Sequence, residues 1–397
     1  MSAIFGATIR HFEVKRGDLR ESRLVESAKP AGDALQAGQV LLRIEHFALT
    51  ANNITYATFG DVMQYWNFFP AQSGWGRVPV WGFAVVEASY HEQVLVGERV
   101  YGYFPMSSHL LVQADRISPA GFIDASAHRQ PMAAIYNQYT RCASDPGYDA
   151  AHEAEQMLLR PLFMTSFLID DFLADNQFFG ARRVVLSSAS SKTAYGCAFM
   201  LAKRVAAASG SAFGSTANNA TDSAPLELDT VVGLTSRQNS PFVHRLGFYG
   251  QINTYDQISS LPKVPTVYVD MAGSRELREA IHQQLGDSLQ YSCAVGGTHW
   301  EDVSGANATP LPGPKPVLFF APAQVKKRLA EWGCAQFAAR TAQAWAEFMS
   351  RVNRPGEVLL TVTRQLGDSA MQQRYVEVLE GKTAADQGIV LGFGMAE

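Results

Sequence analysis

The chain has 397 residues, 47% of them hydrophobic and 18% charged, which fits about two folded domains and excludes a disordered protein. The net charge of −4 gives no basic surface, so we expect no nucleic-acid partner. We find neither an apolar leader segment nor a run of about 18 uncharged apolar residues, and therefore expect a cytoplasmic protein without a membrane span. The four cysteines lack metal-ligand spacing, which argues against structural zinc and a disulfide framework.

The N-terminal part predicts a small β-barrel or sandwich. Short β-rich runs occupy residues 40–50, 80–89 and 94–118, and Gly and Pro punctuate them. The pattern then changes to a helical insertion at about residues 119–160, with helices expected at 128–143 and 149–176. We predict that residues 1–160 form one domain together with this insertion.

Residues 161–320 predict a nucleotide-binding domain. Strand and helix patterns alternate from residue 183 onward, as in a doubly wound parallel sheet. Residues 208–227 interrupt the alternation with small polar residues and are predicted to be a surface insertion. Residues 321–397 begin with helical patterns and end with strand patterns, so we expect this segment to return and complete the first domain.

The first strand of the alternating region leads into the turn SSASSKT, at the position where dinucleotide folds carry glycines. Ser188, Ser191 and Thr193 offer hydroxyl donors to a phosphate, and Lys192 adds a positive charge at the start of a helix. An ordinary strand followed by an N-capped helix explains the same residues equally well. The segment alone leaves both interpretations open.

The next strand ends in Ser236 and Arg237, with no acidic residue in SRQN. A site for NADH usually places an acid there for the ribose 2′-hydroxyl, whereas an arginine accommodates the 2′-phosphate of NADPH. The pattern therefore favours NADPH as cofactor. The alternative for Arg237 is a solvated surface arginine.

These features occur in the order found in the medium-chain dehydrogenase/reductase superfamily, and the chain resembles its zinc-free, quinone-oxidoreductase-like side. The resemblance covers nearly the whole chain through loose motifs, namely residues 40–61, 79–89, 97–106, 158–173, 244–256, 267–273, 291–300 and 359–393. It implies a GroES-like β-barrel catalytic domain beside a Rossmann-type domain. It also implies hydride transfer from NADPH to a small apolar substrate with an activated double bond (an enone or enoyl thioester) or to a quinone, and a homodimer formed through the sheet edges of the nucleotide domains.

The chain departs from the family at two places. Zinc-dependent members have a cysteine where this chain has Ala51 and Gly-His-Glu where it has Gly82-Phe83-Ala84, so we expect no metal. The three fingerprint glycines are replaced, at positions matching Ser188, Ser191 and Ala194. This loss motivates an alternative function, a catalytically degenerate member of the fold that binds a nucleotide or a partner protein.

The resemblance also suggests the remaining site residues. Thr165 matches a position near the nicotinamide, Tyr255 joins Arg237 at the 2′-phosphate, and Gly296 is a further cofactor contact. Tyr56 lies in the near-wall loop and is the first catalytic choice, because a neutral tyrosine hydroxyl donates a hydrogen bond at pH 7. Tyr136 and Tyr139 are three residues apart, which would place both on one helical face at the substrate. The alternative for Tyr56 is a half-buried tyrosine at a strand end, and for Tyr136 and Tyr139 it is a packed aromatic face.

Overall fold

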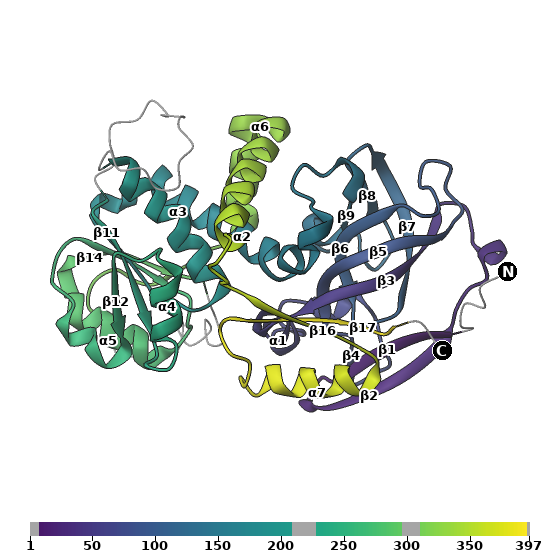
Figure 1. Cartoon of the computed structure of the whole chain (residues 1–397), viewed down its shortest axis with the longest axis horizontal. Coiled ribbons are helices and arrows are strands. Elements are labelled where there is room, and N and C mark those ends of the chain that lie inside the picture. The colour runs from purple at the N-terminus through teal and green to yellow at the C-terminus, as the bar shows by residue number, and fades with distance from the viewer. Residues whose placement is uncertain (1–7, 209–227, 296–309, 395–397) are drawn as a thin grey trace. The chain divides into compact units, whose positions relative to one another are not determined.

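The computed structural model describes residues 8–208, 228–295 and 310–394, and the chain folds into two compact units (Figure 1). Residues 1–158 and 360–397 make the first unit, and residues 159–359 make the second. Gly296 and nearly all of the predicted polar insertion, residues 209–227, lie outside the described residues.

A closed six-stranded barrel forms the centre of the first unit. Its strands follow the order β3 (Gln39–Leu49), β5 (Pro79–Ser89), β6 (Arg99–Pro105), β9 (Gln138–Arg141), β8 (Gly121–Asp124) and β7 (His109–Ser118), and β7 pairs with β3. Strand β17 (Gln387–Gly392) extends the sheet antiparallel to β3, and β16 (Thr361–Leu366) runs parallel to β17. The C-terminal residues 360–397 therefore belong to the first unit.

The remaining elements of the first unit lie around this barrel. They are a three-stranded sheet of β2 (Asp18–Ala28), β1 (Thr8–Lys15) and β4 (Trp75–Gly76), the helices α1 (Ala51–Thr58) and α7 (Asp368–Leu379), and the 3-10 turns η1 (Gly32–Ala34), η2 (Tyr65–Phe68), η3 (Ala134–Asn137), η4 (Cys142–Ser144) and η5 (Ala150–His152). Alternating residues of the strands, such as Val40, Leu42 and Ile44, form one buried core.

The predicted helix at 128–143 is wrong. This segment forms the turn η3 and the strand β9, which pairs with β6 and β8. The local residue spacing suits a helix, but closing the barrel requires a strand at this point, and tertiary pairing outweighs local preference. The second predicted helix is present as α2 (Glu153–Asp175).

The second unit contains a six-stranded, all-parallel sheet. The order is β12 (Gln251–Thr254), β11 (Thr230–Thr235), β10 (Arg183–Leu186), β13 (Thr266–Asp270), β14 (Leu289–Ala294) and β15 (Val317–Leu318). In chain order this is the 3-2-1-4-5-6 arrangement of a Rossmann fold. The accompanying helices and turns are α3 (Lys192–Ala208), α4 (Ser240–Leu246), α5 (Arg275–Leu285), α6 (Ala321–Val352), η6 (Gln177–Gly180), η7 (Tyr255–Ser260) and η8 (Gly286–Ser288). All four residues of β10 are buried, as expected for a central parallel strand.

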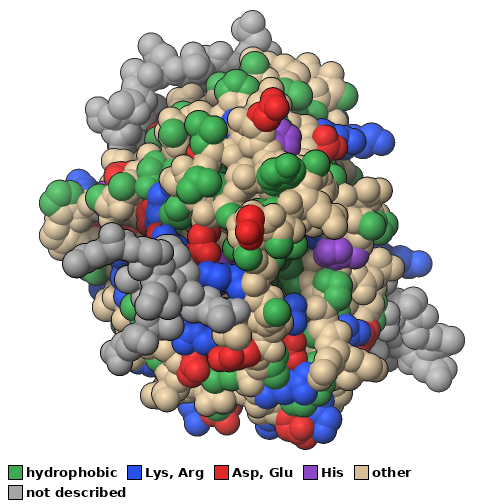
Figure 2. Space-filling model, turned by 90° about the vertical axis from the view of Figure 1, so that its right-hand side faces the viewer, with side chains coloured by type: hydrophobic (Ala, Val, Ile, Leu, Met, Phe, Trp, Pro, Cys, Tyr) green, Lys and Arg blue, Asp and Glu red, His purple; other side chains and the backbone are tan. Residues whose placement is uncertain are grey.

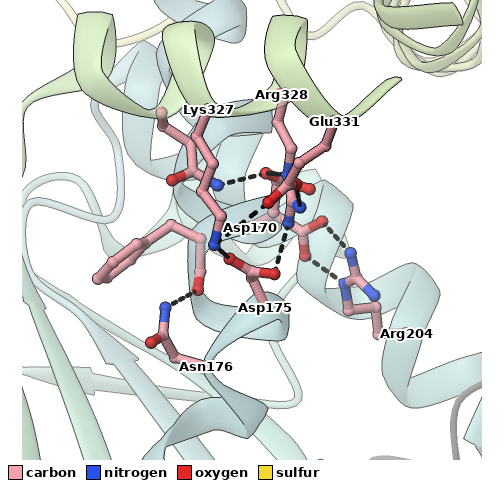
Figure 3. A network of polar contacts seen from close by, with 10 residues as sticks. Asp170, Asp175, Asn176, Arg204, Lys327, Arg328 and Glu331 are labelled. Carbon is pink, nitrogen blue, oxygen red and sulfur yellow. Dashed lines mark hydrogen bonds and ion pairs between the residues drawn. The ribbon is translucent and has the colours of Figure 1, made fainter. Parts of the chain in front are cut away.

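The long helix α6 belongs to the second unit, so the return to the first unit begins at residue 360 rather than 321. Ion pairs attach α6 to α2 (Figure 3). Arg328 is buried and contacts Asp171 at 2.6 Å and Asp175 at 3.0 Å, while Lys327 also pairs with Asp175. On the α3 side, Arg204 pairs with Asp170 of α2 at 2.7 Å. These ion pairs hold α6 against α2 and explain why α6 belongs to the second unit and not to the C-terminal return segment.

On the face shown in Figure 2, acidic, basic and hydrophobic side chains are interspersed. In the part of the chain that the structure describes, no helix is long and apolar enough to cross a membrane. Cytoplasmic location and the lack of a nucleic-acid partner stay predictions.

Candidate active site

The turn after β10 keeps the backbone form that glycine normally supplies. Ser188, at the first fingerprint position, has φ of +50°, in the left-handed region that non-glycine residues rarely adopt. The next residue, Ala189, donates its N–H to Leu234 O at 2.9 Å and accepts a hydrogen bond from the Tyr249 hydroxyl at 2.8 Å. A Cβ on Gly233 would lie 2.8 Å from the Tyr249 ring. The turn is therefore held tightly against the end of β11 although its own glycines are missing.

The start of α3 supports part of the alternative interpretation. The Ser191 hydroxyl accepts a hydrogen bond from the backbone N–H of Ala194 at 3.3 Å, which is an N-cap. Lys192 and Thr193 follow as the first two residues of the helix and are half-buried. The carbonyl of Thr193 accepts a hydrogen bond from Ser166 of α2 at 2.7 Å, and half-buried Thr165 is the residue before Ser166. Ser191 thus has a structural role whether or not a phosphate binds.

Three strand ends meet in a group of polar side chains that we call the strand-end cluster: Ser188, Ser190, Ser236, Asn239 and Tyr255. Asn239 joins the loops after β10 and β11, because its amide donates to the Ser190 hydroxyl at 3.1 Å and its backbone N–H donates to the Ser236 hydroxyl at 3.2 Å. Tyr255, directly after β12, interacts with Ser188; burial raises the pKa of Tyr255, and the hydrogen bonds with Ser188 partly offset this.

The donor set at this edge suits the phosphates and ribose of a dinucleotide. The carboxyl ends of parallel strands are where doubly wound folds bind ligands. At the end of β11, the Thr235 hydroxyl is buried and has no hydrogen-bond partner among the described residues, so a polar group there is left for a ligand to satisfy. Hydroxyls, one amide and the nearby Arg237 therefore fit a nucleotide chemically.

Arg237 is exposed and forms an ion pair that the sequence did not reveal. Its Nη2 lies 2.6 Å from Asp256 Oδ2, and its side chain is 82% exposed. Both residues line a surface hollow of about 420 Å³. The rest of the lining comes from helix α4, the last residue of β12 and the turn η7, namely Ser240, Pro241, His244, Thr254 and Gln257. The sequence does carry a signal for Asp256, because this residue directly follows Tyr255 after the neighbouring strand β12.

In the first unit, two of the three predicted catalytic tyrosines lie in one aromatic group. This tyrosine cluster consists of Tyr56, Tyr65, Tyr103 and Tyr136, surrounded by Phe68, Phe69 and Trp81. The ring centroids of Tyr56 and Tyr65 are 4.7 Å apart, and those of Tyr103 and Tyr136 are also 4.7 Å apart. Tyr56 lies on helix α1 rather than on a loop.

Burial keeps the cluster's hydroxyls protonated. Burial raises the pKa of Tyr56 to about 12, the neighbouring Tyr65 adds to the shift, and hydrogen bonds from Trp81, Asn52 and Tyr136 oppose it. Burial likewise raises the pKa of Tyr103 and of Tyr136. The Tyr103 hydroxyl is fully buried and has no hydrogen-bond partner in the described part of the chain. The cluster thus offers neutral hydroxyl donors in a largely apolar setting.

The expected shared face of Tyr136 and Tyr139 is wrong. Tyr139 lies on β9 and packs into the barrel core between Phe104 and Phe122, and its hydroxyl donates to Tyr103 O at 3.1 Å. A Cβ on Gly102 would lie 2.5 Å from the Tyr139 ring, so the ring fills the space above this glycine. For Tyr139 the structure supports the alternative of a packed core residue.

A buried cation, Arg129, contacts the tyrosine cluster and was not predicted from the sequence. Arg129 has no exposed surface, its Nε donates to Asn137 Oδ1 at 2.8 Å, and its Nη2 donates to Tyr136 O at 2.6 Å. Its guanidinium lies 5.1 Å from the Phe68 ring centroid and 4.9 Å from that of Phe69. Arg129 therefore fixes η3, and with it the position of Tyr136.

Among the described residues, no group of three or more His, Cys, Asp or Glu side chains could hold a metal ion. The absence of zinc stays a prediction from the replaced ligands at Ala51 and Phe83.

A family model matches residues 47–384 of the sequence. The chain belongs to the DUF2855 family. That family is described as a protein of unknown function, and no curated protein gives a significant sequence match to the chain.

Solved structures share the fold at low identity. CurA from Vibrio vulnificus in complex with NADPH is 15% identical, with a TM-score of 0.57 over 98% of this chain and 100% of that chain. CurK enoyl reductase is 13% identical, with a TM-score of 0.54 over 97% and 99% of the two chains. The quinone oxidoreductase from Coxiella burnetii is 12% identical, with a TM-score of 0.53 over 98% and 100%. The predicted fold, a GroES-like barrel unit and a Rossmann-type unit, is confirmed.

Proposed function

We propose that the chain is a zinc-independent reductase of the medium-chain dehydrogenase/reductase superfamily, which uses NADPH to reduce an activated double bond or a quinone. The observation that carries this proposal is the strand-end cluster, in which hydrogen bonds join the loops after β10 and β11 while Tyr255 after β12 contacts Ser188. Such a cluster at the carboxyl edge of a 3-2-1-4-5-6 sheet is the usual place for a dinucleotide. The fold shared with an NADPH complex and with an enoyl and a quinone reductase is consistent with it.

In this proposal Ser188, Ser190 and the N-terminus of α3 hold the pyrophosphate, and Lys192 adds a positive charge beside it. Thr193 is the second residue of the same helix, and Ser236, Arg237 and Tyr255 bind the adenosine ribose and its phosphate. Thr165 is proposed to lie near the nicotinamide, and Gly296 stays a predicted cofactor contact. When bound, NADPH supplies the hydride; the chain's own residues orient the acceptor and provide a proton.

Tyr56 is the group proposed to donate a hydrogen bond to the acceptor oxygen and then a proton. Its raised pKa, about 12, keeps it protonated through the physiological range, which a donor requires. The sign of the shift also means that Tyr56 leaves the stability of the fold unchanged with pH below about 10 and lowers it as the pH rises from 10 towards 12, because the folded state holds the proton more tightly than the unfolded state. Tyr136 orients Tyr56 through their hydroxyl contact.

The first experiment is a nucleotide titration. NADPH and 2′,5′-ADP should each raise the melting temperature of the full chain, because a ligand that binds only the folded state stabilises it. No shift with millimolar NADPH would contradict the reductase proposal.

The second experiment tests Tyr56 with 1,4-benzoquinone and an α,β-enone as acceptors, following NADPH oxidation by absorbance. We expect Tyr56→Phe to lower kcat about 100-fold or more while NADPH affinity stays unchanged. The matched control is Tyr375→Phe, another buried tyrosine of the first unit, whose hydroxyl donates to Leu19 O at 3.0 Å. Equal losses in the two variants would show that Tyr56 is a core residue.

A catalytically degenerate binding protein is the second candidate. The observation that favours it is the N-cap of Ser191, because this hydroxyl already occupies a helix N–H that a phosphate would otherwise use. Weak or absent NADPH binding, or binding without NADPH oxidation by any acceptor, would support it.

The homodimer is also a proposal. Edge strand β15 exposes Val317 and Leu318 to 47% and 48%, and exposed apolar edges favour pairing with a second sheet. Sedimentation should show a dimer that Val317→Lys weakens.

A further inference from the structure

We propose that the ion pair between Arg237 and Asp256 makes the adenosine site accept both NADPH and NADH. This inference rests on the proposed nucleotide binding and deepens it by naming the groups that set the cofactor choice. Arg237 follows β11 and Asp256 follows β12, so both lie at the carboxyl ends of neighbouring parallel strands. Their side chains meet at 2.6 Å on the hollow described above.

A site selective for NADPH presents a cation to the 2′-phosphate, and a site selective for NADH presents a carboxylate to the ribose 2′-hydroxyl. This hollow holds one of each, and the two are paired. The 2′-phosphate can bind Arg237 only beside the Asp256 carboxylate, which repels it. The same carboxylate is available to accept a hydrogen bond from the 2′-hydroxyl of NADH.

The exposure of the pair allows the exchange between these partners. The Arg237 side chain is 82% exposed and that of Asp256 is 49% exposed, so water can replace each contact as the other forms. Ser240, Thr254 and Gln257 line the same hollow and offer uncharged polar groups that suit either cofactor. The pair thus weakens NADPH binding and retains NADH binding.

The test measures the dissociation constants of NADPH and NADH by calorimetry at low salt and near 0.15 M salt, and uses 2′,5′-ADP and 5′-AMP as probes of the adenosine end. For the wild type we expect the NADPH and NADH constants to lie within about tenfold of each other, because the attraction and the repulsion oppose one another. In Asp256→Asn, NADPH and 2′,5′-ADP should bind about threefold to fivefold more tightly, and NADH more weakly. In Arg237→Gln, NADPH should lose affinity and NADH should keep it.

A matched control is the exposed pair of Arg182 and Asp229, which lies at the opposite, amino ends of β10 and β11. Its atoms are 2.9 Å apart and both side chains are about half exposed. Asp229→Asn removes the same charge from the same unit without touching the hollow, so it should leave the NADPH-to-NADH ratio unchanged.

A wild-type preference above about 100-fold for either cofactor would overturn the dual-cofactor proposal. Equal effects of Asp256→Asn and Asp229→Asn on the NADPH-to-NADH ratio would overturn it as well, because the change would then come from the net charge of the protein and not from the hollow. Binding of neither nucleotide to the wild type would overturn the proposed function itself, and with it this inference.

Discussion

Two arginine–aspartate pairs lie at the carboxyl edge of the same sheet and differ in burial. Asp270, the last residue of β13, and Arg278 on the following helix α5 are 1% and 8% exposed, with Oδ2 and Nε 2.9 Å apart. Arg237 and Asp256, after β11 and β12, are 82% and 49% exposed at a similar distance. The residue types are the same and each aspartate lies at or shortly after a strand end, so the two pairs differ mainly in burial and in the surrounding hydrogen bonds.

The buried pair is embedded in further hydrogen bonds. Asp270 accepts hydrogen bonds from the Ser187 hydroxyl at 3.1 Å and from the N–H groups of Ala272 and Gly273 at 3.2 and 3.0 Å. Its oxygens are therefore committed to holding the turn after β13 against the turn after β10. The exposed pair can release its partners to a ligand, which makes it suited to recognition. Variants of the buried pair should therefore lower stability, whereas variants of the exposed pair should change nucleotide binding.

The largest expected effect belongs to Asp270→Asn. It leaves the Arg278 charge buried without its counter-ion, so we expect the free energy of unfolding to fall by about 3–5 kcal/mol, measured by urea titration. The double variant Asp270→Asn with Arg278→Met should recover a large part of this loss, because it removes the isolated charge. A loss in the single variant no larger than that of an exposed-pair variant would remove the distinction between the two pairs.

Ser187→Ala should have the next largest effect. The Ser187 hydroxyl donates to Asp270 and accepts from the N–H groups of Met271 and Ala272 at 2.9 and 3.1 Å, so its loss leaves buried polar groups unsatisfied. We expect about 1–3 kcal/mol in the same urea titration. Ser144→Ala in the first unit is the control, since the Ser144 hydroxyl is exposed and donates to Pro119 O within that same unit. Equal losses in both variants would contradict the role given to burial.

The two serines of the turn should respond to glycine in opposite directions. Ser188→Gly removes the strain of φ at +50° and should stabilise the fold by about 1 kcal/mol. Ser191→Gly removes an N-cap and should destabilise it by a few tenths of a kcal/mol. Thermal unfolding of the two variants side by side measures the difference. A stability loss in Ser188→Gly would show that its contact with Tyr255 outweighs the backbone strain.

The sequence was informative where buried strands and their ends decide the structure. The apolar runs that became β10, β11 and β13 predicted the parallel sheet, and the polar residues that follow β10 and β11 lie at the ends of neighbouring strands. Local pattern suffices here, because a central parallel strand is buried on both faces and the chain can place polar residues only where the strand ends.

Local pattern failed where partners come from distant parts of the chain. Tyr139 became a core residue because β9 pairs with β6 and β8, which the spacing of Tyr136 and Tyr139 does not encode. The buried Arg129 gives no local sign of its burial, since its environment comes from Phe68, Phe69 and Asp124. Asp256 was overlooked because its partner Arg237 lies 19 residues away, at the end of another strand.

The smallest expected effect on stability belongs to the exposed pair. Asp256→Asn and Arg237→Gln should each leave the unfolding midpoint of the nucleotide-free chain unchanged, because water solvates both groups in the folded and the unfolded protein. With saturating 2′,5′-ADP, the melting temperature of Asp256→Asn should rise further than that of the wild type, and that of Arg237→Gln should rise less. A loss of stability in the nucleotide-free Asp256→Asn variant as large as that of Ser187→Ala would instead make the exposed pair a structural element. The separation between the two pairs would then have to be sought in something other than burial.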